Sequence, residues 1–189
     1  MRLFTGISLS PNVVDRLSAA VETLRPTAYL NWSPVENLHI TCRFIGEWPE
    51  DRLPDLTRAL GTVATPGPIP VHISRFGFFP NPHHPHSFFA GVQSGPELAN
   101  LATAINRALL PLGLAPEGRP YLPHVTLARI KKNSDIRALR EHIAAMTDFD
   151  FGAFDASDFH LFVSKPATRG SVYTKLATYD LMRETKTIS

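Results

Sequence analysis

The chain has little of three things that mark whole classes of protein: cysteine, net charge and long apolar runs. Its 189 residues include one cysteine, Cys42, so an intramolecular disulfide is impossible, and the formal net charge is only +2. That charge is too small to indicate a general nucleic-acid coat or membrane surface, so any anion site must be local. No segment approaches the roughly 18 apolar residues of a membrane span, and Pro11, Asn12 and Asp15 interrupt the start before signal-peptide length. We therefore expect a cytoplasmic protein without a membrane segment.

Proline is abundant by contrast, with 17 residues that fall mainly between periodic segments, as in "TPGPIP", "FFPNPHHPH" and "GRPYLPH". Apolar residues at three- and four-residue spacing predict four amphipathic helices, whose stripes begin at Val14, Leu53, Leu98 and Ile136. The segments between them predict strands at 2–9, 37–45, 69–79, 87–93, 121–130, 154–163 and 171–181. The order is strand, helix, strand, helix, strand, given twice and followed by one extra strand.

A four-residue pattern occurs once in each copy of this order, as "HITC" at 39–42 and "HVTL" at 124–127. The offset from His39 to His124 is 85 residues, and the offset from Thr41 to Thr126 is also 85. The same shift places "LFTGIS" of the first strand on "FFAGVQ" at 88–93, with Gly6 on Gly91. The recurrence of both motif and element order predicts an internal duplication within one domain, 1–189, with structural halves at about 1–80 and 86–189.

Alternation along a strand separates the polar residues of the first motif from the apolar ones. His39, Thr41 and Arg43 share one face, while Ile40 and Cys42 share the other. The apolar face should pack under helices, so the polar face should line a cleft. His124 and Thr126 are separated from Val125 and Leu127 in the same way. Two lobes related by an approximate two-fold axis would bring both histidines and both threonines to one central cleft.

Two histidines in one cleft suit general acid–base catalysis, because an unperturbed pKa near 6.5 allows one to be neutral while the other is protonated. One imidazole would accept a proton from the nucleophile and the other would donate one to the leaving oxygen. The threonine hydroxyls can bind an oxyanion between them, an arrangement that suits phosphoryl chemistry. The motif strands lack the acidic cluster of a two-metal phosphodiesterase, so we expect neither a metal nor another cofactor.

With these motifs the sequence resembles the 2H phosphoesterases, and among them the LigT-like RNA 2′,3′-cyclic phosphodiesterases. The resemblance spans nearly the whole chain. The segments that carry it are "RLFTGISL", "ENLHITCRFIGE", "RFGFFPNP", "RPYLPHVTLARIK", "FDFGAF" and "VYTKLATYDL". It implies an α+β fold of two pseudo-two-fold related lobes, each of antiparallel sheet with outer helices, around a central cleft.

The resemblance also implies an activity and roles for residues. The activity is hydrolysis of RNA 2′,3′-cyclic phosphate ends to 2′-phosphomonoesters. His39 matches the proton donor to the departing 3′ oxygen, and His124 matches the base that activates water. Thr41 and Thr126 match the phosphate-binding threonines. Because the two histidines can be coupled, their pKa values would belong to the pair.

Two arginines are candidate phosphate contacts. Arg129 matches a family arginine five residues after the second histidine, but strict alternation places it on the opposite face from His124, so a bulge or the strand end must re-aim it. Arg43 has the parity expected of a residue that faces the cleft. The alternative for either residue is a solvated surface charge.

Other residues have weaker functional readings. His83, His84 and His86 could suggest a metal, but no acidic residue accompanies them, so a loop near the cleft mouth is preferred. Base stacking is conceivable for some aromatic residues, although core packing is favoured for most of them: Trp32, Phe78 and Phe79. Structural roles are expected for His72, His142 and His160. Cys42 lies on the buried face, which argues against a nucleophilic role.

Several functions remain open at this stage. The leading hypothesis is a metal-independent cyclic phosphodiesterase that acts on RNA or nucleotide ends and functions as a monomer without an obligate protein partner. The same cleft could carry out 2′–5′ RNA ligation, which is the reverse chemistry, or cleave 2′–5′ oligonucleotides. A hypothesis of another class is a non-catalytic module that binds RNA ends or nucleotides.

Overall fold

The computed structural model describes residues 1–65, 67–168 and 170–181, while the rest of the predicted domain 1–189 lies outside the described residues. The helices are α1 (Pro11–Leu24), α2 (Leu53–Leu60), α3 (Pro96–Leu109) and α4 (Arg137–Ala145). The strands are β1 (Arg2–Ser8), β2 (Asn31–Trp32), β3 (His39–Glu47), β4 (Ile69–Phe79), β5 (Ser87–Ser94), β6 (His124–Arg129), β7 (Asp150–Ala156), β8 (Asp158–Ala167) and β9 (Gly170–Asp180). The predicted α+β class is confirmed.

The C-terminal strands differ from the prediction. The segment expected as one strand at 154–163 belongs to two strands, β7 and β8, which are separated only by Ser157. No proline or glycine stands between Phe154 and Val163, so the sequence carries no breaker to mark the change of partner there. β7 pairs with β4, whereas β8 pairs with β1 and β9. The backbone N–H of Leu181, just after β9, donates to the Ser157 carbonyl at 2.8 Å and joins the break to the end of β9.

The strands form one antiparallel sheet in the order β7-β4-β5-β6-β3-β1-β8-β9, with β2 beside β6. The sheet has two halves of four strands that meet where β6 lies next to β3. Each half combines both sequence repeats: β4 joins strands of the second repeat, and β8 and β9 join strands of the first. The duplication itself stays a prediction, but its sequence boundaries do not coincide with the two halves of the sheet.

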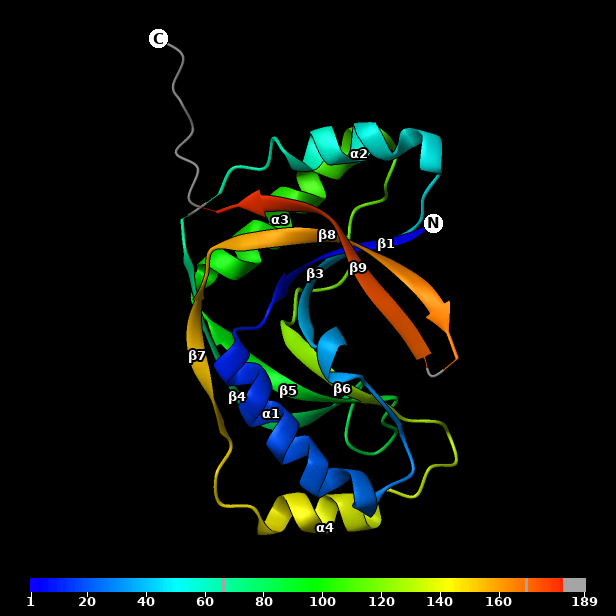
Figure 1. The fold of residues 1–189 in the computed structure, drawn as a ribbon, viewed down its shortest axis with the longest axis vertical. Coiled ribbons are helices and arrows are strands. Elements are labelled where there is room, and N and C mark those ends of the chain that lie inside the picture. The colour runs from blue at the N-terminus through cyan, green and yellow to red at the C-terminus, as the bar shows by residue number, and fades with distance from the viewer. Residues whose placement is uncertain (66, 169, 182–189) are drawn as a thin grey trace.

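The helices are exchanged between the halves in the same way (Figure 1). α1 follows β1 in sequence but packs on β7, with α4 beside it, whereas α3 follows β5 but packs on β3, with α2 beside it. Each helix pair presents an apolar stripe to the sheet, with Leu17 and Leu24 of α1 and Leu98 and Ile105 of α3 at 1% exposure or less. No helix among the described residues is both long enough and apolar enough to cross a membrane.

Phe88 lies at the centre of the half that contains β6 and is completely buried. Its ring contacts those of Phe76, Phe78 and Trp32 at centroid distances of 5.1, 5.2 and 6.0 Å. Offset and edge contacts of this kind stabilise a core beyond the apolar area that they bury. Phe88 therefore supports β6, where it pairs with Ala128 just after the second motif.

We expect Phe88→Ala to lower the free energy of unfolding by about 3–5 kcal/mol, because it removes a whole buried ring and leaves a cavity. Denaturant unfolding followed by circular dichroism measures this loss. Val172→Ala is the control, because Val172 is 53% exposed on β9 and its truncation should change stability by less than about 0.5 kcal/mol. Equal losses in the two variants would contradict the assignment of Phe88 to the core.

Candidate active site

β3 and β6 bring the two motifs together at the middle of the sheet. Their one registered pair is Ile40 with Val125, in an antiparallel arrangement. Extending this register by one residue on each side places His39 opposite Thr126 and Thr41 opposite His124. Each histidine therefore lies across from the threonine of the other copy. All four side chains are partly exposed and share one face, whereas Ile40 and Val125 are completely buried on the other.

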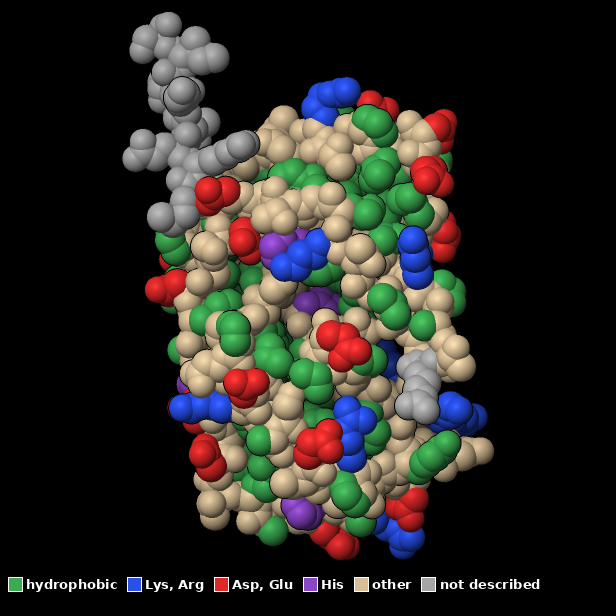
Figure 2. Space-filling view, in the orientation of Figure 1, with side chains coloured by type: hydrophobic (Ala, Val, Ile, Leu, Met, Phe, Trp, Pro, Cys, Tyr) green, Lys and Arg blue, Asp and Glu red, His purple; other side chains and the backbone are tan. Residues whose placement is uncertain are grey.

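The two histidines are held by the same local contact. His39 Nδ1 lies 2.6 Å from the Asn37 carbonyl oxygen, and His124 Nδ1 lies 2.8 Å from the Leu122 carbonyl oxygen. A carbonyl only accepts, so Nδ1–H donates in both cases and Nε2 is left for chemistry. The Thr41 hydroxyl donates to His39 Nε2 at 3.0 Å. Figure 2 shows histidine side chains near the centre of one face, one of them within a hollow.

Aromatic rings enclose the imidazole of His39. The rings of Phe4, Tyr173 and Phe162 lie 4.8, 5.3 and 6.0 Å from it. The last two residues come from β9 and β8, more than a hundred positions along the chain. Sequence reasoning missed all three, because no local pattern indicates which distant strands will flank His39.

A second aromatic pair flanks His124. Phe79 and Phe89 stack on each other at 4.2 Å, and their centroids lie 4.8 and 5.5 Å from the imidazole. Gly77 makes this possible, because a Cβ at this position would lie only 2.3 Å from the Phe89 ring. Phe79, considered from the sequence as a base-stacking residue, therefore contacts the second histidine.

Burial lowers the pKa of both imidazoles below the ordinary value of 6.5, because a partly enclosed site disfavours the charged form. The hydrogen bonds to Asn37 and Leu122 act in the opposite direction. Arg129 lowers the pKa of both histidines further through its positive charge, and His124 does the same to His39. Both imidazoles are therefore neutral near pH 7 before an anion binds.

A β-bulge re-aims Arg129 toward the two histidines. Against β5, Phe89 pairs with Thr126 and Phe88 pairs with Ala128, so Leu127 is the extra residue. Leu127 and Ala128 are consequently both buried, and Arg129 is exposed on the side of His124 rather than opposite to it. Its effect on the pKa of both histidines agrees with this placement.

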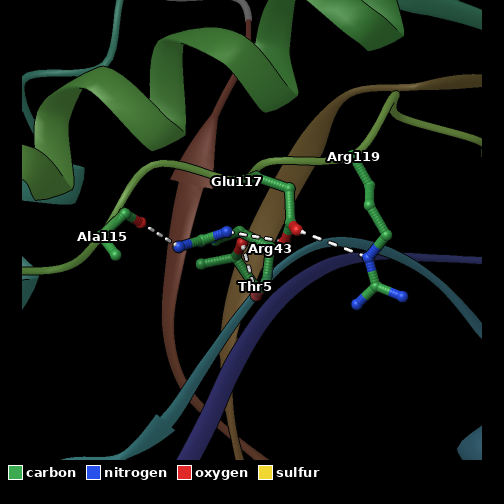
Figure 3. A network of polar contacts seen from close by, with 5 residues as sticks. All are labelled: Thr5, Arg43, Ala115, Glu117 and Arg119. Carbon is green, nitrogen blue, oxygen red and sulfur yellow. Dashed lines mark hydrogen bonds and ion pairs between the residues drawn. The ribbon is translucent and has the colours of Figure 1, made fainter.

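Arg43 is turned away from the histidines, and the orientation predicted for it is wrong. A bulge at Cys42 pairs Thr5 with Arg43, and the fully buried Thr5 lies on the face opposite to Phe4 and His39. The guanidinium donates from Nη1 to Glu117 Oε2 at 2.7 Å and from Nη2 to the Ala115 carbonyl at 2.6 Å (Figure 3). Strict alternation fails here because Cys42 is an extra residue in β3. Cys42 and Arg43 both stand against Thr5, so Arg43 takes the face opposite to Thr41.

The bulges at Cys42 and Leu127 lie 85 residues apart, as the histidines do. They make Phe44 the positional equivalent of Arg129. The first strands follow a different offset, because β1 pairs Ser8 with His39 while β5 pairs Gly91 with His124, a difference of 83. The predicted equivalence of Gly6 with Gly91 is therefore wrong by two residues, a slip that preserves which face each residue occupies.

The remaining candidate residues lie outside the tetrad of His39, Thr41, His124 and Thr126. The loop from 80 to 86 joins β4 to β5, and its Asn81 side chain accepts from the backbone N–H groups of His83 and His84 at 2.9 and 3.0 Å. Across residues 1–65, 67–168 and 170–181, no group of three or more His, Cys, Asp or Glu is placed to hold a metal. Burial raises the pKa of the Cys42 thiol to about 12, which keeps it protonated.

The other histidines and aromatics bond within the fold or lie on its surface. His72 bonds to Asp150 at 2.9 Å, and this partner raises its pKa. Buried His160 bonds to Thr178 at 3.0 Å across β8 and β9. The remaining residues of this group are His142, which lies on α4, and Phe78 and Trp32, which contact Phe88.

Comparison with known proteins identifies the family. The family model of the 2′-5′ RNA ligase superfamily matches residues 13–166, and the chain belongs to this superfamily. The structure also resembles the crystal structure of TT0787 of Thermus thermophilus, with a TM-score of 0.79, 26% identity and coverage of 96% of this chain and 98% of that one. E. coli LigT, solved with 3′-AMP, shares the fold at a TM-score of 0.77, 22% identity and the same coverage. The predicted LigT-like fold is confirmed.

Proteins similar in sequence carry a functional name. The RNA 2′,3′-cyclic phosphodiesterase of Methanocaldococcus jannaschii is 30% identical over 173 residues, which cover 92% of this chain and 96% of that protein. The RNA 2′,3′-cyclic phosphodiesterase of Aeropyrum pernix is 33% identical over 142 residues, which cover 75% and 80%. The predicted resemblance to this family is confirmed.

We expect Arg129→Gln to raise the pKa of both His39 and His124, because it removes a positive charge that lowers both. Titration of the imidazole Cε1–H resonances by NMR measures the shift. Arg129→Lys is the matched control, since it keeps the charge and should leave the pKa values lowered. No rise in Arg129→Gln would contradict the placement of the guanidinium beside the two rings.

Proposed function

We propose that the protein hydrolyses RNA 2′,3′-cyclic phosphate ends to 2′-phosphomonoesters by metal-independent acid–base catalysis. The observation that carries the proposal is the crossed pairing of the two motifs, which places each histidine across from the other copy's threonine. The similar proteins of Methanocaldococcus jannaschii and Aeropyrum pernix, both named RNA 2′,3′-cyclic phosphodiesterase, support it.

The proposed mechanism assigns one proton transfer to each Nε2 atom. Neutral His124 accepts a proton from water, whose oxygen attacks phosphorus and forms the new P–O bond. The bond from phosphorus to the 3′ oxygen breaks, and protonated His39 donates its proton to that oxygen, leaving the phosphate on the 2′ oxygen. His39 can be protonated in the complex because the bound phosphate anion raises the pKa that burial and Arg129 lower in the free protein.

The hydroxyls and one arginine bind the phosphate in this scheme. Thr41 and Thr126 donate to the non-bridging oxygens, where charge is concentrated in the transition state. Arg129 adds a guanidinium that acts electrostatically on both histidines. Arg43 is assigned no contact with phosphate, since its guanidinium is bound to Glu117 and Ala115 on the other side of β3.

A second activity fits the same residues. If the 5′-hydroxyl of another RNA strand takes the place of water, the chemistry joins the two ends through a 2′–5′ bond, and the superfamily description supports this candidate. Hydrolysis should dominate in water because solvent is abundant. Cleavage of 2′–5′ oligonucleotides, the cytoplasmic location and the monomeric state stay predictions, as does the alternative of a module that only binds RNA ends.

The proposal is tested by incubating the purified protein with a 2′,3′-cyclic RNA end in the presence of EDTA. We expect turnover that resists EDTA and gives a 2′-phosphate, because the transfers need only the two imidazoles. His39→Ala and His124→Ala should each lower kcat by about 10²–10⁴-fold. Undiminished turnover in either variant would refute the assignment, and a 3′-phosphate product would reverse which bond breaks. An inactive wild-type protein that still binds the RNA end would favour the binding module.

A matched pair of variants distinguishes the roles proposed for Arg129 and Arg43. We expect Arg129→Ala to lower kcat/KM by about tenfold to a thousandfold, because a donor to the charged phosphate is lost. Arg43→Ala should lower the melting temperature, because Glu117 loses its 2.7 Å partner and keeps only Arg119 at 3.9 Å, while kcat/KM changes by less than about threefold. Steady-state kinetics and thermal unfolding on both proteins measure this contrast, and the reverse pattern would restore Arg43 as the phosphate ligand.

A further inference from the structure

A large groove lies just beyond Arg129, at the end of β6. Its volume is about 1040 Å³, and it is lined by the segment 26–31 on one side and by residues between 131 and 141 on the other. Asn31 lines the groove and pairs with Arg129 through β2, so the groove begins beside Arg129. None of its lining residues belongs to the tetrad of catalytic candidates.

The direction of β6 shows which side of the proposed site the groove serves. Passing along the strand from His124, Thr126 lies opposite His39, and Arg129 lies beyond that point. The groove is therefore on the His39 side of the pair. Under the proposed mechanism His39 donates to the 3′ oxygen, so the ribose of the terminal nucleotide lies on this side. The rest of an RNA strand continues from the 5′ oxygen of that ribose.

The lining of the groove has the chemistry of a single-strand binding surface. Tyr29 is 99% exposed, an unusual state for a tyrosine because the ring gains nothing from burial. Base–aromatic stacking tolerates any sequence because every base has a π-face. Asn31 and Asn133 add amide donors and acceptors.

The charges in the groove leave one cation for a phosphate. Arg137 is clamped by Asp135 through contacts of 2.7 to 3.2 Å, so this pair is neutral. Lys131 is exposed and forms no ion pair within the described part of the chain. With Glu141 also present, the groove has no strong net charge, which favours one stacked base and one phosphate contact over a long electrostatic track.

We propose that this groove binds the nucleotides that precede the terminal cyclic phosphate of a single-stranded RNA, with Tyr29 stacked on a base and Lys131 contacting a phosphate. The inference rests on the proposed function, because the direction of the strand follows from the role given to His39. It makes the protein an enzyme of RNA ends, for which a cyclic mononucleotide leaves the groove unfilled.

The test compares kcat/KM for a 2′,3′-cyclic mononucleotide and for a short single-stranded RNA with the same terminal nucleotide. We expect the wild-type protein to favour the RNA. Tyr29→Ala should lower kcat/KM for the RNA about five- to a hundredfold, the range for losing one stacked base, and leave the mononucleotide unchanged. Tyr29→Phe should retain the preference. A wild-type protein without preference, or equal losses on both substrates, would overturn the proposal.

Equilibrium binding separates this inference from the proposed function. Fluorescence anisotropy with an RNA that ends in a 2′-phosphate requires no turnover. It therefore measures the affinity of the groove for RNA even if neither substrate is hydrolysed. Lys131→Gln should reduce the slope of log affinity against log salt by about 0.7, the value for one single-strand phosphate contact. Arg107→Gln, exposed on α3, which packs on β3 and α2 and does not line the groove, is the matched control. An unchanged slope in Lys131→Gln would remove the phosphate contact from the proposal.

Discussion

The candidate site depends on one strand pairing, that of Ile40 with Val125 between β3 and β6. This pairing joins the two halves of the sheet and fixes where each histidine lies relative to the other copy's threonine. A slip of one residue would turn one motif to the apolar face, and a slip of two would separate His39 from Thr126. Both residues of the pair are completely buried, so hydrophobic burial on one face of the strands sets the geometry of the polar face.

Sequence patterns predicted the tetrad because its information is local. A histidine and a threonine two positions apart share a face in any strand, and the recurrence of the motif 85 residues later supplied the second pair. The orientations of Arg43 and Arg129 depend on bulges at Cys42 and Leu127, which exist only in relation to the partner strands. The alternation of side chains along a single strand cannot predict such bulges. The same limit explains the misplaced Gly6–Gly91 equivalence, the unseen break at Ser157 and the aromatic walls from β8 and β9.

The two copies keep their backbone similarity and differ in what surrounds it. Both histidines donate from Nδ1 to a carbonyl two residues earlier, and both strands bulge at the same position. The second residue after the bulge is Phe44 in one copy and Arg129 in the other. A symmetric frame therefore carries an asymmetric charge, which gives two similar imidazoles a basis for different roles in one reaction.

The exchange of strands between the halves has a consequence for how the chain folds. A fragment of residues 1–80 would contain β4 without β5 or β7, and β1 without β8, so both edges of β4 and one edge of β1 would lack their partners. Neither repeat is an autonomous folding unit, and the contacts that complete each half span most of the chain. High contact order of this kind slows folding and makes it cooperative. Each half of the sheet therefore depends on strands from both ends of the chain, and the seam that holds the histidines joins two halves that are complete only when nearly all strands are present.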